Sequence, residues 1–383
     1  MAARTRKLRF QQLEAKQLMA GDVLASVDAA GNLNVLEAAS DVNEAQTIEI
    51  IQTEAGYTKV TGTDGTLVNG YEYQLFQVRP TAAINVALGG GNDMVAVRGV
   101  QMGSLNLDLG RQSYTGQDRD IVEVSSTNLT GELRINTLSR GAGEADQDGV
   151  SLTDVAANGG ISVSTGFSSD AIEMTRVVSG TERSSATLSI SADDLQSDRG
   201  AGNDTVILRN VDSFGLAAIY TGRPGLGIDT DAVNIQSMTV RGSLITSMGD
   251  GENRFTANNL NVERDLSYFG DQGVDHIDIA FARIGGDLSI STGASNDEVT
   301  ISDSRVGRVA EISTGDGADS VDMRRNVMMA IDIALGDNAL AAGTDRLTMI
   351  GNRALFLLAD GGPGVNARDI QNNSFWNQAW SNF

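Results

Sequence analysis

Residues 275–301 read DHIDIAFARIGGDLSISTGASNDEVTI, and this stretch decides the fold. Asp275 is followed by Ile277 and Ile279, and Asp297 begins the same pattern 22 residues later. Apolar residues at the second and fourth positions after an aspartate alternate with other residues, which is the period of a β-strand. A strand that returns at a fixed interval indicates stacked structural repeats.

The same aspartate anchor recurs along most of the chain. The anchors are Asp93, Asp120, Asp148, Asp170, Asp204, Asp231, Asp275, Asp297, Asp319 and Asp345, with Asn253 at the one gap. Successive anchors from 231 to 319 are 22 residues apart, and elsewhere the step is 22 to 34 residues. A second alternating pair precedes many anchors, as at Leu288 and Ile290, and a third apolar point follows them, as at Val306. Three apolar points in each repeat suit a three-walled coil.

A single coil cannot bury its own inner side chains, so the coils must stack. We therefore predict an all-β fold, a right-handed parallel β-helix (β-solenoid) of about 11–12 coils with N- and C-terminal caps. Asn-Gly, the strongest signal of a tight hairpin turn, is scarce among the repeats, which disfavours a propeller or a sandwich. Inward stacks are expected to hold Val95, Val122, Val206, Val233, Ile277, Val299 and Val321 in one column, about 4.8 Å apart between adjacent coils.

The chain divides into four parts. Residues 1–22 are a candidate export segment, and residues 23–80 are an N-terminal β cap with strand-like stretches at Thr47–Gln52 and Tyr71–Val78. The repeats occupy residues 81–370. Residues 371–383 form an aromatic C-terminal cap, in which the expected plug over the last coil consists of Phe375, Trp376, Trp380 and Phe383. The alternative is that these aromatic residues form a contact surface for a partner.

Extra residues lengthen several repeats between the first strand and the anchor. They occupy roughly residues 109–119, 137–147, 192–203, 221–230 and 335–344. In a stacked solenoid these insertions emerge along one edge, where insertions often build a binding face. The alternative is that they are exposed loop tips, where added length costs little free energy.

Composition excludes several classes of protein. The chain has 383 residues, with 44 Gly, a formal net charge of −22 and no Cys. Such acidity disfavours nucleic acid, whose phosphates require Lys and Arg, and it disfavours an anionic membrane surface. The lack of Cys excludes disulfides and thiolate metal sites. No apolar run of about 18 residues predicts a transmembrane helix.

Residues 1–22 differ from the rest because a basic start, with Arg4, Arg6, Lys7 and Arg9, leads to small residues at its end. This composition is typical of an export signal, although no continuous apolar stretch of 7–15 residues is present. The alternative is an amphipathic helix that caps the solenoid.

Residues 8–22, LRFQQLEAKQLMAGD, resemble the LEPR-XLL segment at the start of many planctomycete extracellular proteins. Leu13, Glu14 and Leu18 match that pattern. The sequence departs from it at the positions of its Pro, its Arg and its second Leu, which are Ala15, Lys16 and Met19. The resemblance implies export, with removal of the segment near residues 20–22, and a location that is extracellular or at the cell surface. It implies nothing about activity.

Several anchors end Gly- and Asp-rich loops, such as Gly89-Gly90-Gly91-Asn92-Asp93. These loops resemble the calcium-binding Gly-Gly-x-Gly-x-Asp nonapeptide of RTX proteins, although here the motif returns about every 22 residues rather than every nine. The resemblance implies Ca²⁺ as a cofactor. The candidate metal ligands are Asp93, Asp204, Asp275, Asp297, Asp316 and Asp319. The alternative is a structural turn, in which Asp accepts hydrogen bonds from its own backbone and Gly supplies a positive φ.

A column of anchor carboxylates one strand spacing apart needs relief from its own repulsion. Bound Ca²⁺, raised pKa values and capping of backbone N–H groups are three ways to supply it. If bound Ca²⁺ reduces this repulsion, adding calcium should raise the melting temperature of the protein. The double substitution Asp297→Asn with Asp319→Asn should then remove part of that increase. Asn253 favours capping at its own position, because an amide caps without a charge.

Catalytic signals are weak, and we assign no catalytic residue. The one His of the chain, His276, is expected to point outward from its strand, and acidic pairs such as Asp193-Asp194 arise by chance among 50 acidic residues. The first hypothesis is a secreted or cell-surface structural or adhesive protein without catalytic activity, whose candidate partner is a polysaccharide or a cell-envelope component. The alternatives are a polysaccharide lyase or hydrolase on a β-helix and an RTX-like calcium-stabilised module. A concave groove with converging Arg and carboxylate groups would favour the enzyme.

Overall fold

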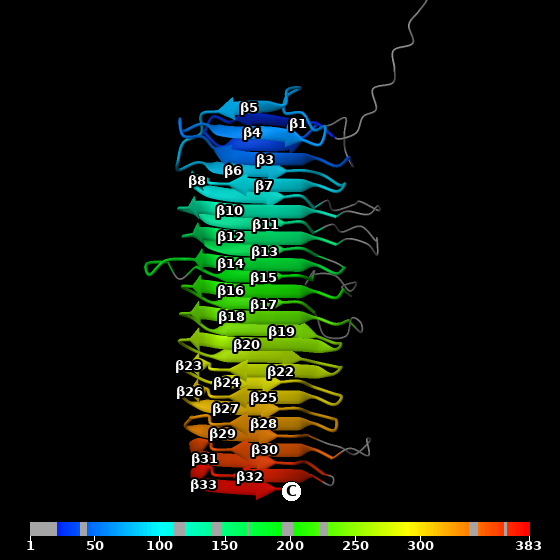
Figure 1. Cartoon of the computed structure of the whole chain (residues 1–383), viewed down its shortest axis with the longest axis vertical. Helices are drawn as coiled ribbons and strands as arrows, with labels where there is room; N and C mark the ends of the chain where they lie inside the picture. Colours follow the sequence, from blue (N-terminus) through cyan, green and yellow to red (C-terminus); the bar gives the residue numbers. More distant parts are fainter. Residues whose placement is uncertain are drawn as a thin grey trace, which may run out of the picture.

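The protein is described by a computed structural model that covers residues 21–38, 44–110, 119–138, 147–166, 168–184, 186–193, 202–222, 229–336, 344–363 and 366–383. Within these ranges the chain is all-β and forms a β-solenoid of about 11 turns, as the repeat predicts. The coils stack along one axis (Figure 1). The proposed export segment and most of the inserted residues lie outside the described ranges.

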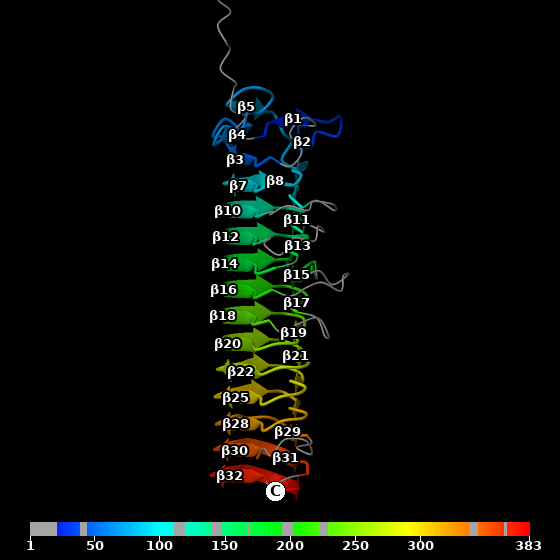
Figure 2. The same cartoon turned by 90° about the vertical axis from the view of Figure 1, so that its right-hand side faces the viewer.

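Two long sheets run the length of the stack and form its facing walls (Figure 2). Sheet 1 consists of β1 (Val23–Val27), β2 (Leu33–Glu37), β6 (Ala83–Ala87), β9 (Ser104–Asp108), β11 (Glu132–Asn136), β13 (Gly160–Ser164), β15 (Leu188–Ser191), β17 (Ala217–Tyr220), β19 (Leu244–Gly249), β21 (Leu266–Gly270), β24 (Leu288–Ser291), β27 (Val309–Ser313), β29 (Ala330–Ala334), β31 (Arg353–Asp360) and β33 (Ser374–Ser381). Sheet 2 consists of β3 (Thr47–Gln52), β4 (Thr58–Thr63), β5 (Tyr73–Phe76), β7 (Met94–Arg98), β8 (Gln101–Met102), β10 (Ile121–Leu129), β12 (Gly149–Ala157), β14 (Ala171–Ser179), β16 (Thr205–Ser213), β18 (Ala232–Val240), β20 (Asn253–Val262), β22 (Asp275–Ala280), β23 (Arg283–Ile284), β25 (Glu298–Ser302), β26 (Arg305–Val306), β28 (Ser320–Arg324), β30 (Arg346–Ile350) and β32 (Ala367–Gln371).

The predicted apolar column lies inside the stack. Ile277 pairs with Val299, and Val299 pairs with Val321, through the parallel strands β22, β25 and β28. The same register joins Val95 to Val122 between β7 and β10. These side chains are buried, and the column confirms the assignment of the second position after each anchor to the core. Each coil therefore contributes a thin layer of Val, Ile and Leu, and stacking excludes water from it.

Each coil contains three wall segments, and two of them belong to sheet 2. In one coil these segments are β24, β25 and β26, and Val306 of β26 is the third apolar point. The last two segments meet at a corner, where Asp303 has a φ of 50°. In other coils the corresponding segments join into one strand of nine residues, such as β12, which bends at Asp154 with a φ of 56°.

This corner is a column of left-handed residues that the sequence did not predict. The residue six positions after each anchor has a positive φ in every coil, in the order Gly99, Ser126, Asp154, Arg176, Asn210, Ser237, Asn259, Phe281, Asp303, Arg325, Gly351 and Asn372. At a positive φ the Cβ atom lies too close to the backbone carbonyl, so Gly, which has no Cβ, is favoured. Asn is also tolerated, because its short side chain can form a local hydrogen bond. Here stacking enforces it on every residue type, so no shared residue marks the corner in the sequence.

Phe281 is the least suitable residue in this corner column, and Phe281→Gly is expected to stabilise the fold. Its φ is 53° and its side chain is 59 % exposed, so the substitution relieves backbone strain and removes little packing. We expect a gain of about 1 kcal/mol in the free energy of unfolding, measured by urea denaturation. The control Ala280→Gly, one residue earlier in β22, should instead cost about 0.5–1 kcal/mol. Equal losses in both variants would contradict strain at the corner.

The N-terminal cap changes the direction of its strands. β1 and β2 pair antiparallel, and so do β3 with β4 and β4 with β5. β2 then pairs in parallel with β6, and β3 with β7, so each begins the parallel stacking of one long sheet. The predicted strand at Thr47–Gln52 is confirmed as β3, and the stretch at Tyr71–Val78 contains β5.

Three of the four aromatic residues of the expected C-terminal plug pack against the core. Phe375, Trp380 and Phe383 are partly buried against the core, and the rings of Trp380 and Phe383 meet edge to face at 5.9 Å between centroids. The prediction is wrong for Trp376, which is 86 % exposed. Trp376 follows Phe375 directly in β33, but its side chain does not share the core contact of Phe375 and Trp380.

Candidate functional site

Five of the six candidate metal ligands lie in one buried column at the start of the sheet 2 strands. Asp93, Asp204, Asp275, Asp297 and Asp319 are all at most 2 % exposed. Register pairs the anchors of adjacent coils, as Asn253 with Asp275. Asp316 is different, because it lies in the exposed loop before Asp319 and its carbonyl accepts a hydrogen bond from the Ser295 N–H.

The anchor side chains form caps between coils. Oδ1 of every anchor except Asp275 accepts a hydrogen bond from the backbone N–H of the equivalent residue in the preceding coil: Asp275 N–H donates to Asp297 and Asp297 N–H to Asp319, each at 2.8 Å. The same bond repeats along the column, from Gln46 to Asp93, Asp93 to Asp120, Asp120 to Asp148, Asp148 to Asp170, Asp170 to Asp204, Asp204 to Asp231, Asp231 to Asn253, Asp319 to Asp345 and Asp345 to Asn366.

This ladder differs from the turn expected from the sequence, because the capped N–H belongs to another coil rather than to the anchor's own turn. Its ends are Gln46 and Asn366, which the repeat search missed. Asn366 lies 21 residues after Asp345 and is followed by Arg368 and Ile370, so only the apolar residue at its fourth position fits the pattern. Asn253 interrupts the bonds once, since its N–H donates to the carbonyl of Val274.

Burial raises the pKa of Asp204, Asp231, Asp275, Asp297 and Asp319, and it is the largest cause at each of these five anchors. It raises the pKa of Asp204 to about 11, of Asp231 and Asp275 to about 8, of Asp297 to about 7 and of Asp319 to about 6. The charges of neighbouring anchors raise these pKa values further, whereas the backbone caps lower them. The charged form of a buried carboxyl is disfavoured because water no longer solvates it.

The structure identifies no metal ligand. Within the described ranges, no three His, Cys, Asp or Glu side chains are grouped so that they could hold a metal ion. The anchors instead use one carboxyl oxygen to cap a backbone N–H group. Capping is one of the three ways, named in the sequence analysis, to reduce the repulsion between neighbouring anchor carboxylates. Binding of Ca²⁺ by Asp316, Asp319 and the other anchors stays a prediction.

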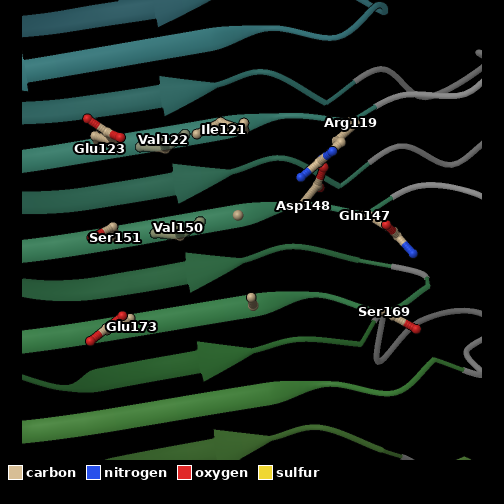
Figure 3. Close-up of a pocket in the computed structure, with 12 residues that line it drawn as sticks. Arg119, Ile121, Val122, Glu123, Gln147, Asp148, Val150, Ser151, Ser169 and Glu173 are labelled. Carbon is tan, nitrogen blue, oxygen red and sulfur yellow. The ribbon is translucent and has the colours of Figure 1, made fainter.

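A shallow groove crosses the outer face of sheet 2 over β10, β12 and β14 (Figure 3). It has a volume of about 360 Å³, and small residues at Gly149 and Ala171 create the hollow. Glu123, Ser151 and Glu173 line it one above another at the same position of three successive coils (Figure 3).

The two glutamates of the groove are each paired with an arginine. Glu123 contacts Arg98 at 3.1 Å, and Glu173 contacts Arg209, so each ion pair joins the glutamate to a neighbouring coil. All four side chains are at least 38 % exposed. A general acid of a glycosidase needs a raised pKa, which burial usually supplies. Exposed, ion-paired glutamates lack that environment, and they form a surface network of charges instead.

The remaining candidates from the sequence lie apart from one another. His276 is exposed on β22 as predicted, and its Nδ1 lies 3.3 Å from Glu298 on the next coil. Asp193 is buried beside the anchor column, where its charge raises the pKa of Asp204. Asp194 lies outside the described residues.

Comparison with known proteins gives no relative: no family model, no curated protein and no solved structure matches this chain. No helix in the part of the chain that the structure describes is long and apolar enough to span a membrane.

Proposed function

We propose that this chain is a structural or adhesive β-solenoid that works outside the cytoplasm, at the cell surface or secreted, and that it contacts a polysaccharide or another envelope component without catalysis. The observation that supports the proposal is the continuous parallel stacking of its coils, in which the pairing of β19 with β21 contains one shift of register, between Ser247 and Gly249. Parallel pairing links consecutive strands of both sheets from β7 to β32 and from β6 to β33. A stack of about 11 turns at about 4.8 Å per turn is a rod roughly 50 Å long.

Regular stacking also produces regular outer rows. On the outer face of sheet 1, Ser162 pairs with Ser189. Further along the same sheet, Ser267 pairs with Ser289 of the next coil, and Ser289 pairs with Glu311 of the coil after that. Hydroxyl and carboxyl groups therefore recur at the strand spacing, and a polymer with its own repeat can contact several of them at once. Many weak contacts in series give adhesion through multivalency, without a deep pocket.

The location is supported by residues 8–22, which resemble an export segment, and it is tested in native cells. We expect the protein in the envelope or medium fraction, with its N-terminus shortened near residues 20–22, as measured by fractionation and mass spectrometry. The intact chain found solely in the cytosol would contradict export.

The absence of catalysis is tested against the enzyme alternative. The purified chain is incubated with a panel of neutral and acidic polysaccharides, and reducing ends and unsaturated uronate products are measured. We expect no more product than with the heat-unfolded chain. Product that is released by the folded chain and lost in Glu123→Gln or Glu173→Gln would favour a lyase or hydrolase at the groove of Figure 3.

A further inference from the structure

Asp275, Asp297 and Asp319 are buried next to one another in the anchor column. Around Asp297 the facing groups are the carboxyls of Asp275 and Asp319 and the hydroxyl of Thr292. Around Asp319 they are Asp297, Asp345, Asp316 and the hydroxyl of Thr314. No ion pair found among the described residues involves Asp275, Asp297 or Asp319.

At Asp297 and Asp319, only one of the two carboxyl oxygens takes part in a hydrogen bond with another described residue. Oδ1 of Asp297 and Oδ1 of Asp319 each accept a backbone N–H. Oδ2 of both is buried and has no hydrogen-bond partner in the described part of the chain. A carboxylate in this position would leave a charged oxygen without water or a donor, which is costly. A protonated carboxyl turns the same oxygen into a neutral donor.

The neighbouring hydroxyls offer acceptors rather than donors. Thr292 Oγ1 donates to the carbonyl of Thr314, and Thr314 Oγ1 donates to the carbonyl of Leu335, each at 3.1 Å. A hydroxyl has one proton, so while each threonine donates to its carbonyl it faces the adjacent carboxyl of Asp297 or Asp319 with lone pairs. Those lone pairs match a carboxylic acid O–H and not a carboxylate. A hydroxyl turned to donate to the carboxyl instead lowers the pKa of that aspartate, but burial outweighs this effect at both.

The chain itself places neutral groups at two positions of the column. Asn253 and Asn366 accept the same cap through Oδ1, from Asp231 at 3.3 Å and from Asp345 at 3.2 Å. An asparagine has the shape of a protonated aspartate, with an N–H donor where the acid has its O–H. The column therefore functions as a structural ladder without a charge at those positions.

We infer that the anchor column is a proton-holding spine, in which Asp297 and Asp319 keep their protons in the folded chain, so that the solenoid takes up protons as it folds and loses stability as the pH rises. The inference does not depend on the proposed function. If the aspartates hold protons, the folded solenoid is most stable at mildly acidic pH. The aspartates then stabilise the fold without a bound ion.

The direction of the pH effect follows from the pKa values. Burial raises the folded pKa of Asp297 to about 7 and of Asp319 to about 6, above the value of about 3.9 in an unfolded chain. Their stabilising contribution is fully present below about pH 4 and is lost as the pH rises through about 6 to 7. Surface carboxyls act oppositely: hydrogen bonds from Arg325 lower the pKa of Asp303, so its contribution is lost in acid.

The test compares Asp297→Asn/Asp319→Asn with the wild-type chain. At about pH 5 the wild type should take up about two more protons on folding than the variant, measured from the pH dependence of urea unfolding. On raising the pH to about 8, the melting temperature of the wild type should fall more steeply, and the variant should become the more stable protein. The control Glu298→Gln/Glu311→Gln removes two exposed charges, one from β25 and one from β27, and should keep the wild-type proton uptake.

Two results would overturn the inference. One is a double variant that takes up as many protons as the wild type. The other is a wild-type melting temperature that rises with CaCl₂ and loses this rise in the double variant, because a calcium ligand must be ionised. If the double variant does not fold, infrared spectra of the wild type decide: bands of protonated carboxyls at about pH 6 support the spine, and their absence contradicts it.

Discussion

Val299→Asp is expected to lower the free energy of unfolding by about 4 kcal/mol or more, a large part of the 5–15 kcal/mol that usually holds a domain together. Val299 is fully buried in β25, between Ile277 of the preceding coil and Val321 of the following one. The substitution removes apolar burial and places a carboxyl where these neighbours offer no hydrogen-bond partner. Since each coil depends on its neighbours, the damage should spread to the coils on both sides.

The matched control is Thr300→Asp, one residue further along β25. Thr300 points to the outer face, so the same new carboxyl stays in water and should change stability by less than about 0.5 kcal/mol. Circular dichroism during urea unfolding measures both variants. A Val299→Asp chain as stable as the wild type would contradict the inward column, and with it the fold.

The inward column could be predicted because the same type of residue, an apolar one, recurs at a fixed distance from each anchor. Val299 and its equivalents repeat as apolar residues in the coils from Val95 to Leu347, and only one stacking register buries them all. The anchor position could be found in the same way, since Asp recurs there. What Asp does could not be found, because the N–H that it caps lies 22 or more residues away and is a backbone group that leaves no trace in the sequence.

A second ladder was missed for a related reason. Asn326 Oδ1 accepts the N–H of Ser304, and Asn352 Oδ1 accepts the N–H of Asn326, at the position seven residues after each anchor. Earlier coils place Val177 or Leu260 at the equivalent corner. The ladder is thus local to the C-terminal coils. A pattern defined by what all repeats share does not include a feature that only a few of them have. The spacing of 26 residues between Asn326 and Asn352, equal to the local anchor step, is the signal that could have found it.

Gly315→Ala is the second substitution with a large expected effect. Gly315 lies in the loop before Asp319 with a φ of 79°, and an added Cβ would lie 1.8 Å from the carbonyl oxygen of Gly293 in the preceding coil. Gly293 and Gly336 make the same close approach to their own preceding coils. The methyl group must therefore push two coils apart as well as adopt a left-handed backbone. We expect a loss of about 3 kcal/mol, of which about 1 kcal/mol comes from the backbone and the rest from the contact.

Two other glycines separate these causes. Gly99 has a φ of 66° with open space around its Cβ position, so Gly99→Ala should cost about 1 kcal/mol from the backbone alone. Gly149 has neither a positive φ nor a neighbour within 4 Å, so Gly149→Ala should be neutral or gain about 0.5 kcal/mol. Urea unfolding of the three variants should rank their losses as Gly315, Gly99 and Gly149. If Gly315→Ala costs no more than Gly99→Ala, the coils are not held at the spacing that brings the Gly293 carbonyl against Gly315, and the tight stacking of these loops is refuted.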